Sequence, residues 1–404
     1  MIRVDRRKFL LGALSVPAGV ALAGKGIGLL GDGSPGVASE ALLRAKDLKL
    51  KSGTPYPLVA LPGKAPMGQV YDRPPNYETP AEHLIGQRNY PYTDNEYYYV
   101  RYREASVLQL TPENYRLKIG GDAADNEITL TLDELNRRAS TTIGAVGVCS
   151  GEGRGLHHPM IPGMPWTKGD LSCAEWTGVP LNDLLDEVGV KDSALHVSFG
   201  GGRVISLSKP DYWRSYLVET IRQYEPLIAT KMNGEDIPFW NGYPVRLVFP
   251  GTWAPTWTKQ LVEIDIRTTP NEMEWSGREI TPNELKPFSL IVTPTDGTQI
   301  PVKRKVELTG VAYDKGSGIT KVEVSQDEGK TWEEATIEKS YGKYTWRVWH
   351  ATVGFEQTGQ QRVICRATNA DGEVQPIDPA SDVMDSGARK ETAAKVFAGV
   401  FEVV

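Results

Sequence analysis

The sequence predicts an α+β protein in which a mixed α/β domain is followed by an immunoglobulin-like β-sandwich. Two observations support this class. Before residue 285, capped helices alternate with apolar strands, whereas after it short strands with alternating apolar residues follow one another between turns that contain Gly or Asp. The length of 404 residues agrees, because at roughly 150 residues per domain it predicts two or three domains.

Two helix signals fall in the first domain, which we expect at residues 85–284. Thr131 and Glu134 form a capping box that predicts the start of a short helix. A second helix is expected over 180–188, because this segment begins with proline and is followed by Gly189. Both signals place helices between strands, as the mixed class requires.

A strand is expected over 141–148 (T-T-I-G-A-V-G-V), and it leads directly into Cys149 and a glycine-rich turn. Glycines in this turn permit close approach to the sulfur atom, and Arg154 is a nearby cation that favours the thiolate form. Two interpretations stay open from the residues alone. Cys149 is either a functional thiolate or a buried structural cysteine.

The second domain is expected at residues 285–404. Its strands are indicated by period-two apolar positions, such as Val306 with Leu308 and Val322 with Val324. Cys365 lies in register with apolar neighbours two residues away on each side, which predicts a small core residue for it.

The N-terminus resembles an export signal. Residues 1–23 contain the pair Arg6-Arg7, a short apolar run and small residues before Gly24, which together are typical of a twin-arginine signal peptide. This route exports folded proteins, so it predicts a periplasmic location. Residues 24–84 are rich in Gly and Pro and are expected to form an extended arm over the surface.

Composition excludes several classes. Acidic residues outnumber basic ones by 51 to 45, so the net charge of −6 argues against a nucleic-acid-binding protein. Three cysteines in so long a chain do not make a disulfide framework. No C-x-x-C-H motif occurs, so no covalently bound c-type haem is expected.

Four cations lie in otherwise apolar or aromatic segments. Arg101 and Arg103 have strand spacing, which places them on one side of a strand, and Arg246 interrupts the run 243–251 (Y-P-V-R-L-V-F-P-G). Lys259 follows shortly after. A charge in such a run requires a partner, so each cation belongs either to a structural ion pair or to an anion site. Several of them in one domain, beside a cysteine turn and an export signal, favour the anion site.

At this point the chain resembles the sulfite oxidase family of molybdenum enzymes. C-S-G-E-G-R (149–154) is similar to the family's cysteine turn, and 163–185 (G-M-P-W-T-K-G-D-L-S-C-A-E-W-T-G-V-P-L-N-D-L-L) is similar to the family pattern that follows it. Two other segments are similar to the family pattern, namely 231–251 (K-M-N-G-E-D-I-P-F-W-N-G-Y-P-V-R-L-V-F-P-G) and 321–332 (K-V-E-V-S-Q-D-E-G-K-T-W). The resemblance spans about residues 85–380 and implies a molybdopterin-binding domain followed by a dimerisation domain.

The resemblance also implies roles for single residues. Cys149 would be the protein ligand of one molybdenum, which is otherwise held by one molybdopterin, and a soft thiolate suits this metal. Arg101 and Arg103 would act on the substrate, while Arg246 and Lys259 would hold the pterin and its phosphate. The other cofactor-binding positions are Tyr99, Val100, Tyr102, Arg203, Asn241, Trp257 and Thr258. The sequence contains no recognisable haem domain, so a separate periplasmic cytochrome c is the expected electron acceptor.

The chain departs from the family pattern where substrate would bind. Arg103 stands where the family has histidine, and Ile280, five residues after the pocket tryptophan Trp275, stands where it has tyrosine. Asn241 replaces a pterin-contacting histidine, and Arg203 falls near an expected aspartate. The family's overall cofactor-binding pattern is therefore kept, whereas the residues expected around the substrate differ.

The sequence therefore predicts a periplasmic molybdenum oxidoreductase that oxidises sulfite to sulfate, as a homodimer or as a heterodimer with a cytochrome. Two alternatives remain open. The same scaffold would act on sulfane sulfur or another oxyanion, or the chain is a non-catalytic relative. Arg101 is the expected anion-binding residue, and Arg103 or Arg203 would lower the cost of holding a dianion.

Overall fold

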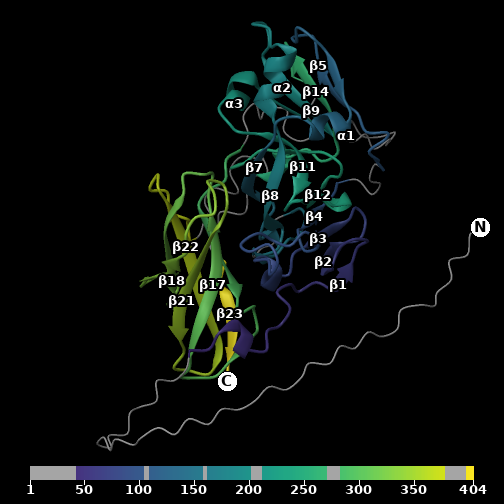
Figure 1. Cartoon of the computed structure of the whole chain (residues 1–404). Helices are drawn as coiled ribbons and strands as arrows, with labels where there is room; N and C mark the ends of the chain where they lie inside the picture. Colours follow the sequence, from purple (N-terminus) through teal and green to yellow (C-terminus); the bar gives the residue numbers. More distant parts are fainter. Residues whose placement is uncertain (1–41, 104–108, 158–161, 202–211, 271–282, 378–396) are drawn as a thin grey trace, which may run out of the picture. The chain divides into compact units, whose positions relative to one another are not determined.

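The computed structural model describes residues 42–103, 109–157, 162–201, 212–270, 283–377 and 397–404 (Figure 1). All of these belong to one unit of the chain, residues 40–404. In these ranges no helix combines the length and the apolar character needed to cross a membrane.

Three sheets occupy the part of the chain before residue 268. The first has the order β1 (Leu58–Ala60), β2 (Pro66–Tyr71), β3 (Asn76–Glu78) and β4 (Val100–Arg101). The second has the order β10 (Trp213–Leu217), β9 (His196–Gly201), β14 (Leu261–Arg267), β5 (Leu117–Gly120) and β6 (Ile128–Leu130), with β14 parallel to β5. The third has the order β12 (Glu235–Asp236), β11 (Leu227–Met232), β8 (Leu171–Pro180) and β7 (Thr141–Val148), and β13 (Arg246–Val248) also pairs with β11.

Short helices connect these strands. Thr131 caps α1 (Leu132–Asn136), where its Oγ1 accepts from the Glu134 backbone N–H at 3.2 Å and its own N–H donates to Glu134 Oε2 at 2.8 Å. Pro180 is the N-cap of α2 (Leu181–Val188), and Gly189 ends it with a positive φ of 76°. Both predicted helices and the predicted strand over 141–148 are therefore confirmed. The other helices are α3 (Val218–Arg222), η1 (Ala45–Asp47), η2 (Ala81–His83), η3 (Arg154–Leu156), η4 (Phe239–Asn241) and η5 (Ala254–Thr256).

The segment 42–84 differs from the extended arm expected over 24–84. It supplies β1, β2 and β3, and β3 pairs with β4 through Asn76 opposite Arg101. All three residues of β3 are buried. The segment therefore forms part of the sheet from which Arg101 projects.

The second half of the described chain is the predicted β-sandwich. One sheet has the order β15 (Phe288–Thr293), β17 (Lys305–Tyr313), β21 (Arg347–Gly354) and β20 (Thr336–Ile337). The other has the order β16 (Gln299–Ile300), β23 (Gly399–Val403), β22 (Gly359–Asn369), β18 (Ile319–Ser325) and β19 (Glu333–Glu334). Alternate residues of these strands face a shared apolar core.

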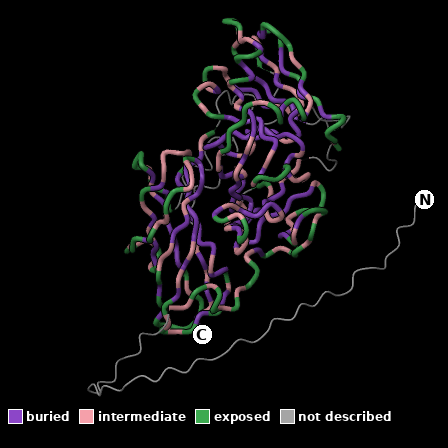
Figure 2. Tube along the Cα trace, viewed as in Figure 1, coloured by how far each residue is buried: buried purple, intermediate pink, exposed green. Residues whose placement is uncertain are grey.

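Burial follows the strands in both halves (Figure 2). Cys365 is fully buried in β22 among the apolar side chains of the sandwich core, as its register predicted. Trp346, just before β21, is also fully buried, and its indole N–H donates to the Pro91 carbonyl at 2.8 Å. That hydrogen bond joins the sandwich to the loop that precedes β4.

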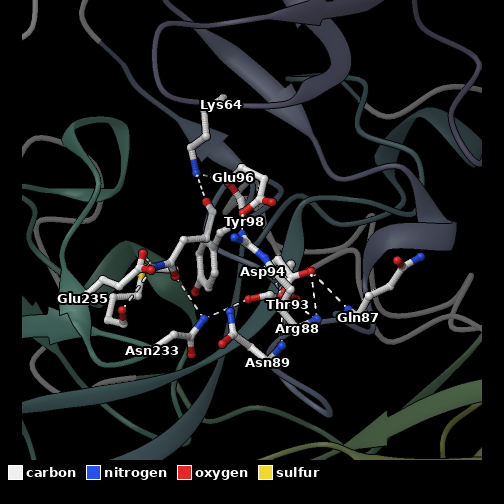
Figure 3. Close-up of polar contacts among 12 residues, drawn as sticks. Lys64, Gln87, Arg88, Asn89, Thr93, Asp94, Glu96, Tyr98, Asn233 and Glu235 are labelled. Carbon is white, nitrogen blue, oxygen red and sulfur yellow. Dashed lines mark hydrogen bonds and ion pairs between the residues drawn. The ribbon is translucent and has the colours of Figure 1, made fainter. Parts of the chain in front are cut away.

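The loop before β4 is held by two polar groups (Figure 3). The buried Asp94 carboxylate accepts backbone N–H groups from residues 87–89 at 3.0–3.4 Å. Asn233 and Gly234 make the two-residue turn between β11 and β12, with positive φ values of 49° and 77° that suit Asn-Gly. The Asn233 amide donates to the Thr93 carbonyl and to Asn95 Oδ1, both at 2.9 Å. These contacts fix the segment that continues into Tyr98 and β4.

Candidate active site

Cys149 lies in the turn after β7, and both its backbone N–H and its backbone carbonyl are hydrogen-bonded. Its N–H donates to the Asp170 carbonyl at 3.0 Å, while its carbonyl accepts from the Glu152 N–H at 3.1 Å. The turn requires glycine at Gly153, where φ is +70° and a Cβ atom would lie 1.9 Å from the Phe397 ring. The predicted glycine-rich turn is thus present, with the cysteine partly buried.

Burial opposes the thiolate form of Cys149, which Arg154 favours as expected. Burial, reinforced by the charge of Asp170, raises the pKa of Cys149 to about 12. Arg101 and Arg154 lower this pKa but do not outweigh burial. Binding a metal at this sulfur would therefore release a proton, as is general for thiolate ligands.

Two carboxyl groups behind the turn were not predicted as site residues. Glu152 and Asp170 are both fully buried, and burial followed by their mutual interaction raises the pKa of Glu152 well above its usual value. Burial likewise raises the pKa of Asp170 to about 7. Nothing in the sequence pairs these residues, because they come from the turn after β7 and the residue before β8.

Arg101 ends β4 and lies within electrostatic reach of the Cys149 thiol. Its Nη1 donates to Asn76 Oδ1 at 3.2 Å and to the Tyr102 carbonyl. Arg103 does not share a strand face with Arg101, because β4 ends at Arg101 and Arg103 lies in the bend beyond it. The prediction of strand spacing for this pair is therefore wrong.

The residues around Arg101 contribute in different ways. Val100 is fully buried in a small core with Met67 and Tyr77. Burial, followed by the charges of Tyr98 and Cys149, raises the pKa of Tyr99 well above its usual value, so its hydroxyl is a neutral donor beside the cysteine. Tyr102 accepts a hydrogen bond on its hydroxyl from Gln260 Nε2 at 2.9 Å.

Three further cations gather behind β4. Arg246 is 2% exposed, and its guanidinium carbon lies 5.2 and 5.4 Å from the ring centroids of Trp176 and Trp257. Lys259 Nζ donates to the carbonyls of Arg101 at 3.1 Å and Trp240 at 2.8 Å, and lies 4.1 Å from the Tyr102 ring centroid. Lys64 Nζ donates to the carbonyls of Asn95 at 2.6 Å and Tyr98 at 2.9 Å.

We call Lys64, Arg246 and Lys259 the cation cluster. Within the described residues no carboxylate forms an ion pair with any of the three. Burial, followed by the charges of Arg246 and Lys64, lowers the pKa of Lys259 well below its usual value. The structural ion pair considered for Arg246 and Lys259 is thus not found among the described residues. Buried cations without a counter-charge favour a bound anion.

Asn241 supports the cation cluster through its side chain and its backbone. Its Oδ1 accepts from Lys64 Nζ, its Nδ2 donates to the Tyr99 carbonyl at 3.1 Å, and its backbone carbonyl accepts from Arg246 Nη1 at 3.0 Å. The side chain is fully buried. Asn241 therefore positions neighbouring groups, whereas the sequence predicted a direct cofactor contact for it.

Thr258 and Arg246 each leave a buried polar atom without a hydrogen bond in the described part of the chain, namely Thr258 Oγ1 and Arg246 Nε. Trp257 is 2% exposed and packs edge-on against Trp176, with ring centroids 6.0 Å apart. Arg203, Trp275 and Ile280, which the sequence also assigned to the site, lie outside the described residues.

Comparison with known proteins gives this site a class. The family described as "Oxidoreductase molybdopterin binding domain" matches residues 104–275, and the one described as "Mo-co oxidoreductase dimerisation domain" matches residues 279–388. The chain thus combines a molybdopterin-binding domain of the oxidoreductase type with a dimerisation domain. It belongs to the sulfite oxidase family of molybdenum enzymes.

Sequence relatives agree with this assignment. The chain is 29% identical over 340 residues to mitochondrial sulfite oxidase of Rattus norvegicus, covering 75% of this chain and 60% of the relative. It is 27% identical over 339 residues to sulfite oxidase of Gallus gallus, covering 75% and 72%. It is also 27% identical over 314 residues to nitrate reductase [NADH] of Spinacia oleracea, covering 65% and 33%. The chain thus spans about three fifths of the length of the rat mitochondrial sulfite oxidase that it matches.

A solved structure shares the fold across nearly the whole chain. The sulfane dehydrogenase SoxCD from Paracoccus pantotrophus superposes with a TM-score of 0.67 at 22% identity, covering 92% of this chain and 95% of that one. The predicted fold class, a mixed α/β molybdopterin-binding domain followed by a β-sandwich, is confirmed.

The residues present fit molybdopterin. The cation cluster supplies positive charge without a carboxylate, and two buried atoms without a hydrogen bond in the described chain, Arg246 Nε and Thr258 Oγ1, are available to bond an added group. Arg246, Lys259 and Thr258 would hold the phosphate and pterin. Cys149 would bind the metal through its sulfur.

Proposed function

We propose that this protein is a periplasmic molybdenum oxidoreductase that oxidises sulfite to sulfate and passes the electrons to a c-type cytochrome. The observation that carries the proposal is the position of Arg101, a cation within electrostatic reach of the Cys149 sulfur. A small oxyanion that reacts beside Cys149 would meet a fixed guanidinium. Relatives named sulfite oxidases support this choice of anion.

The chain's own residues would bind, orient and stabilise the anion. Bound molybdenum would supply the two-electron redox chemistry. Asn76 and the Tyr102 carbonyl hold Nη1 of Arg101, so the guanidinium is oriented before substrate arrives. Tyr99 would donate a hydrogen bond from its neutral hydroxyl, and Arg103 or Arg203 would add positive charge for a dianion.

The proposed molybdenum oxidoreductase would be exported to the periplasm and would act as a dimer. The Arg6-Arg7 signal supports assembly of the cofactor before transport to the periplasm. The match to a dimerisation domain supports a dimer, either of two copies or with a cytochrome. Electrons would then leave to a cytochrome bound to, or colliding with, this dimer.

The decisive experiment is an anaerobic visible spectrum of the oxidised, cofactor-loaded protein before and after sulfite is added. We expect a thiolate-to-molybdenum charge-transfer band that bleaches with sulfite, since the metal then becomes reduced. A band that persists with sulfite would contradict sulfite as the substrate. Absence of any band in protein from a competent host would favour the non-catalytic alternative.

Arg101→Gln tests the anion-binding role. We expect KM for sulfite to rise roughly 10-fold to 100-fold, because a hydrogen bond from a charged donor contributes about 1.5–3 kcal/mol. Steady-state kinetics on protein of equal molybdenum content measures this, with Arg138→Gln, which removes a surface ion pair to Glu187, as the control. Unchanged sulfite affinity in Arg101→Gln would show that the anion binds elsewhere.

A second candidate substrate is sulfane sulfur or another oxyanion. It is favoured by the substitutions in the substrate shell, where Arg103 and Ile280 replace the histidine and tyrosine of the family pattern. The spectral experiment separates it from sulfite. A band that sulfite leaves unchanged, but a sulfane compound bleaches, would support this candidate.

A further inference from the structure

Lys64 comes from the loop before β2, outside the matched residues 104–275, and its ammonium bonds the segment that contains Tyr98 (Figure 3). The residue is 8% exposed. Its ammonium donates to the carbonyls of Asn95 at 2.6 Å and Tyr98 at 2.9 Å, and to Asn241 Oδ1. All three donor positions of the ammonium are therefore used.

These bonds connect the two segments that carry the cofactor-binding residues. Asn95 and Tyr98 precede β4, whereas Asn241 belongs to η4. From Asn241 the network continues to the Tyr99 carbonyl and to Arg246 Nη1. One side chain thus sets the spacing between the segment of Tyr99 and Arg101 and the segment of Arg246.

The charge of Lys64 has no ion-pair partner among the described residues. Glu96 is the acidic residue that acts on the pKa of Lys64, but its carboxylate pairs with Arg88. Burial, opposed by Glu96 and reinforced by Arg246, lowers the pKa of Lys64 to about 7. Three buried cations that repel one another are stabilised together when an anion binds among them.

We propose that Lys64 is a positioning residue of the cofactor's phosphate site: through Asn241 it sets the place of Arg246, and its charge adds to that of Arg246 and Lys259. The inference rests on the molybdopterin-binding class and is independent of the substrate. It assigns a cofactor role to the segment before β4, which supplies Lys64 to the network.

Lys64→Gln and Lys64→Arg test the proposal. Gln keeps hydrogen-bond donors but removes the charge, whereas Arg keeps the charge. Inorganic phosphate is titrated into cofactor-free, full-length protein at about pH 6.5, and the rise in Tm reports its binding. We expect Lys64→Gln to weaken phosphate binding roughly tenfold and Lys64→Arg to retain most of it. Pterin and molybdenum content of protein from a competent host should fall in Lys64→Gln.

Lys168→Gln is the matched control, because Lys168 is similarly buried but paired with Asp296 at 2.6 Å. This variant should lower the starting Tm and leave the phosphate-dependent rise unchanged. A purely structural role for Lys64 predicts the same behaviour for Lys64→Gln. Unchanged phosphate binding and pterin content in Lys64→Gln would therefore overturn the proposal, whatever happens to the starting Tm.

Discussion

Cys149→Ser is expected to abolish the thiolate-to-molybdenum charge-transfer band and sulfite-dependent turnover, and to weaken the binding of molybdenum that the pterin still holds. A soft thiolate suits molybdenum, whereas a serine hydroxyl is a harder and less acidic ligand. Substituting a residue that merely orients a ligand costs roughly 10–100-fold in metal affinity, so we expect at least this loss when the ligand itself is replaced. The visible spectrum measures loss of the charge-transfer band, metal analysis of the purified protein measures the remaining molybdenum, and steady-state kinetics measures turnover.

Cys365→Ser is the matched control for this prediction. Cys365 is also a buried thiol, but it lies in the sandwich core among apolar side chains. We expect this variant to lose some stability and to keep its molybdenum. Should Cys149→Ser keep the charge-transfer band, Cys149 would not be the ligand and the assignment of the cysteine turn would fail.

Local sequence signals predicted the elements that position the site. The capping box at Thr131 and the glycine at Gly189 are complete within a few residues, so they needed no tertiary information. The strand β7 has the predicted ends, because its apolar run stops at the glycine-rich turn of Cys149. For the same reason the turn itself was identified as a candidate site.

Long-range pairing is what the sequence did not reveal. Prolines and glycines in 42–84 indicated an arm, yet β3 pairs with β4 and brings Asn76 to Arg101. Lys64 reaches Asn241 across 177 positions of sequence. Contacts of this kind depend on the register of strands that are distant in sequence, and a single chain carries no local sign of that register.

The pKa of Cys149 also depends on groups that the local sequence does not reveal. Arg154 is close in sequence and suggested a thiolate, whereas burial and Asp170 dominate the pKa of Cys149 in the folded chain. Desolvation acts on every buried ionisable group, so a cation nearby in sequence is a poor guide until burial is known. The metal, once bound, would replace the proton as the counter-charge of this sulfur.

Arg246→Met is expected to remove the cofactor without unfolding the protein. Arg246 is buried between Trp176 and Trp257 and has no carboxylate partner within the described chain, so its charge is a cost until an anion binds. Replacing a buried charge that lacks a counter-charge by an apolar side chain removes the cost of keeping that charge out of water. We therefore expect molybdenum and pterin content to fall at least tenfold, from the loss of about 1.5–3 kcal/mol of charged hydrogen bonding, while the Tm of cofactor-free protein stays equal or rises.

Arg366→Met provides the opposite case. Arg366 lies in the sandwich, where it pairs with Glu323 at 2.8 Å and lies 4.0 Å from the Trp332 ring centroid, so its loss removes both contacts and should lower the Tm while the cofactor content stays normal. The two variants make the same chemical change and differ in whether the protein itself supplies the counter-charge. If Arg246→Met lowered the Tm of cofactor-free protein and left the pterin content normal, Arg246 would be a structural cation and the phosphate would have to be held elsewhere.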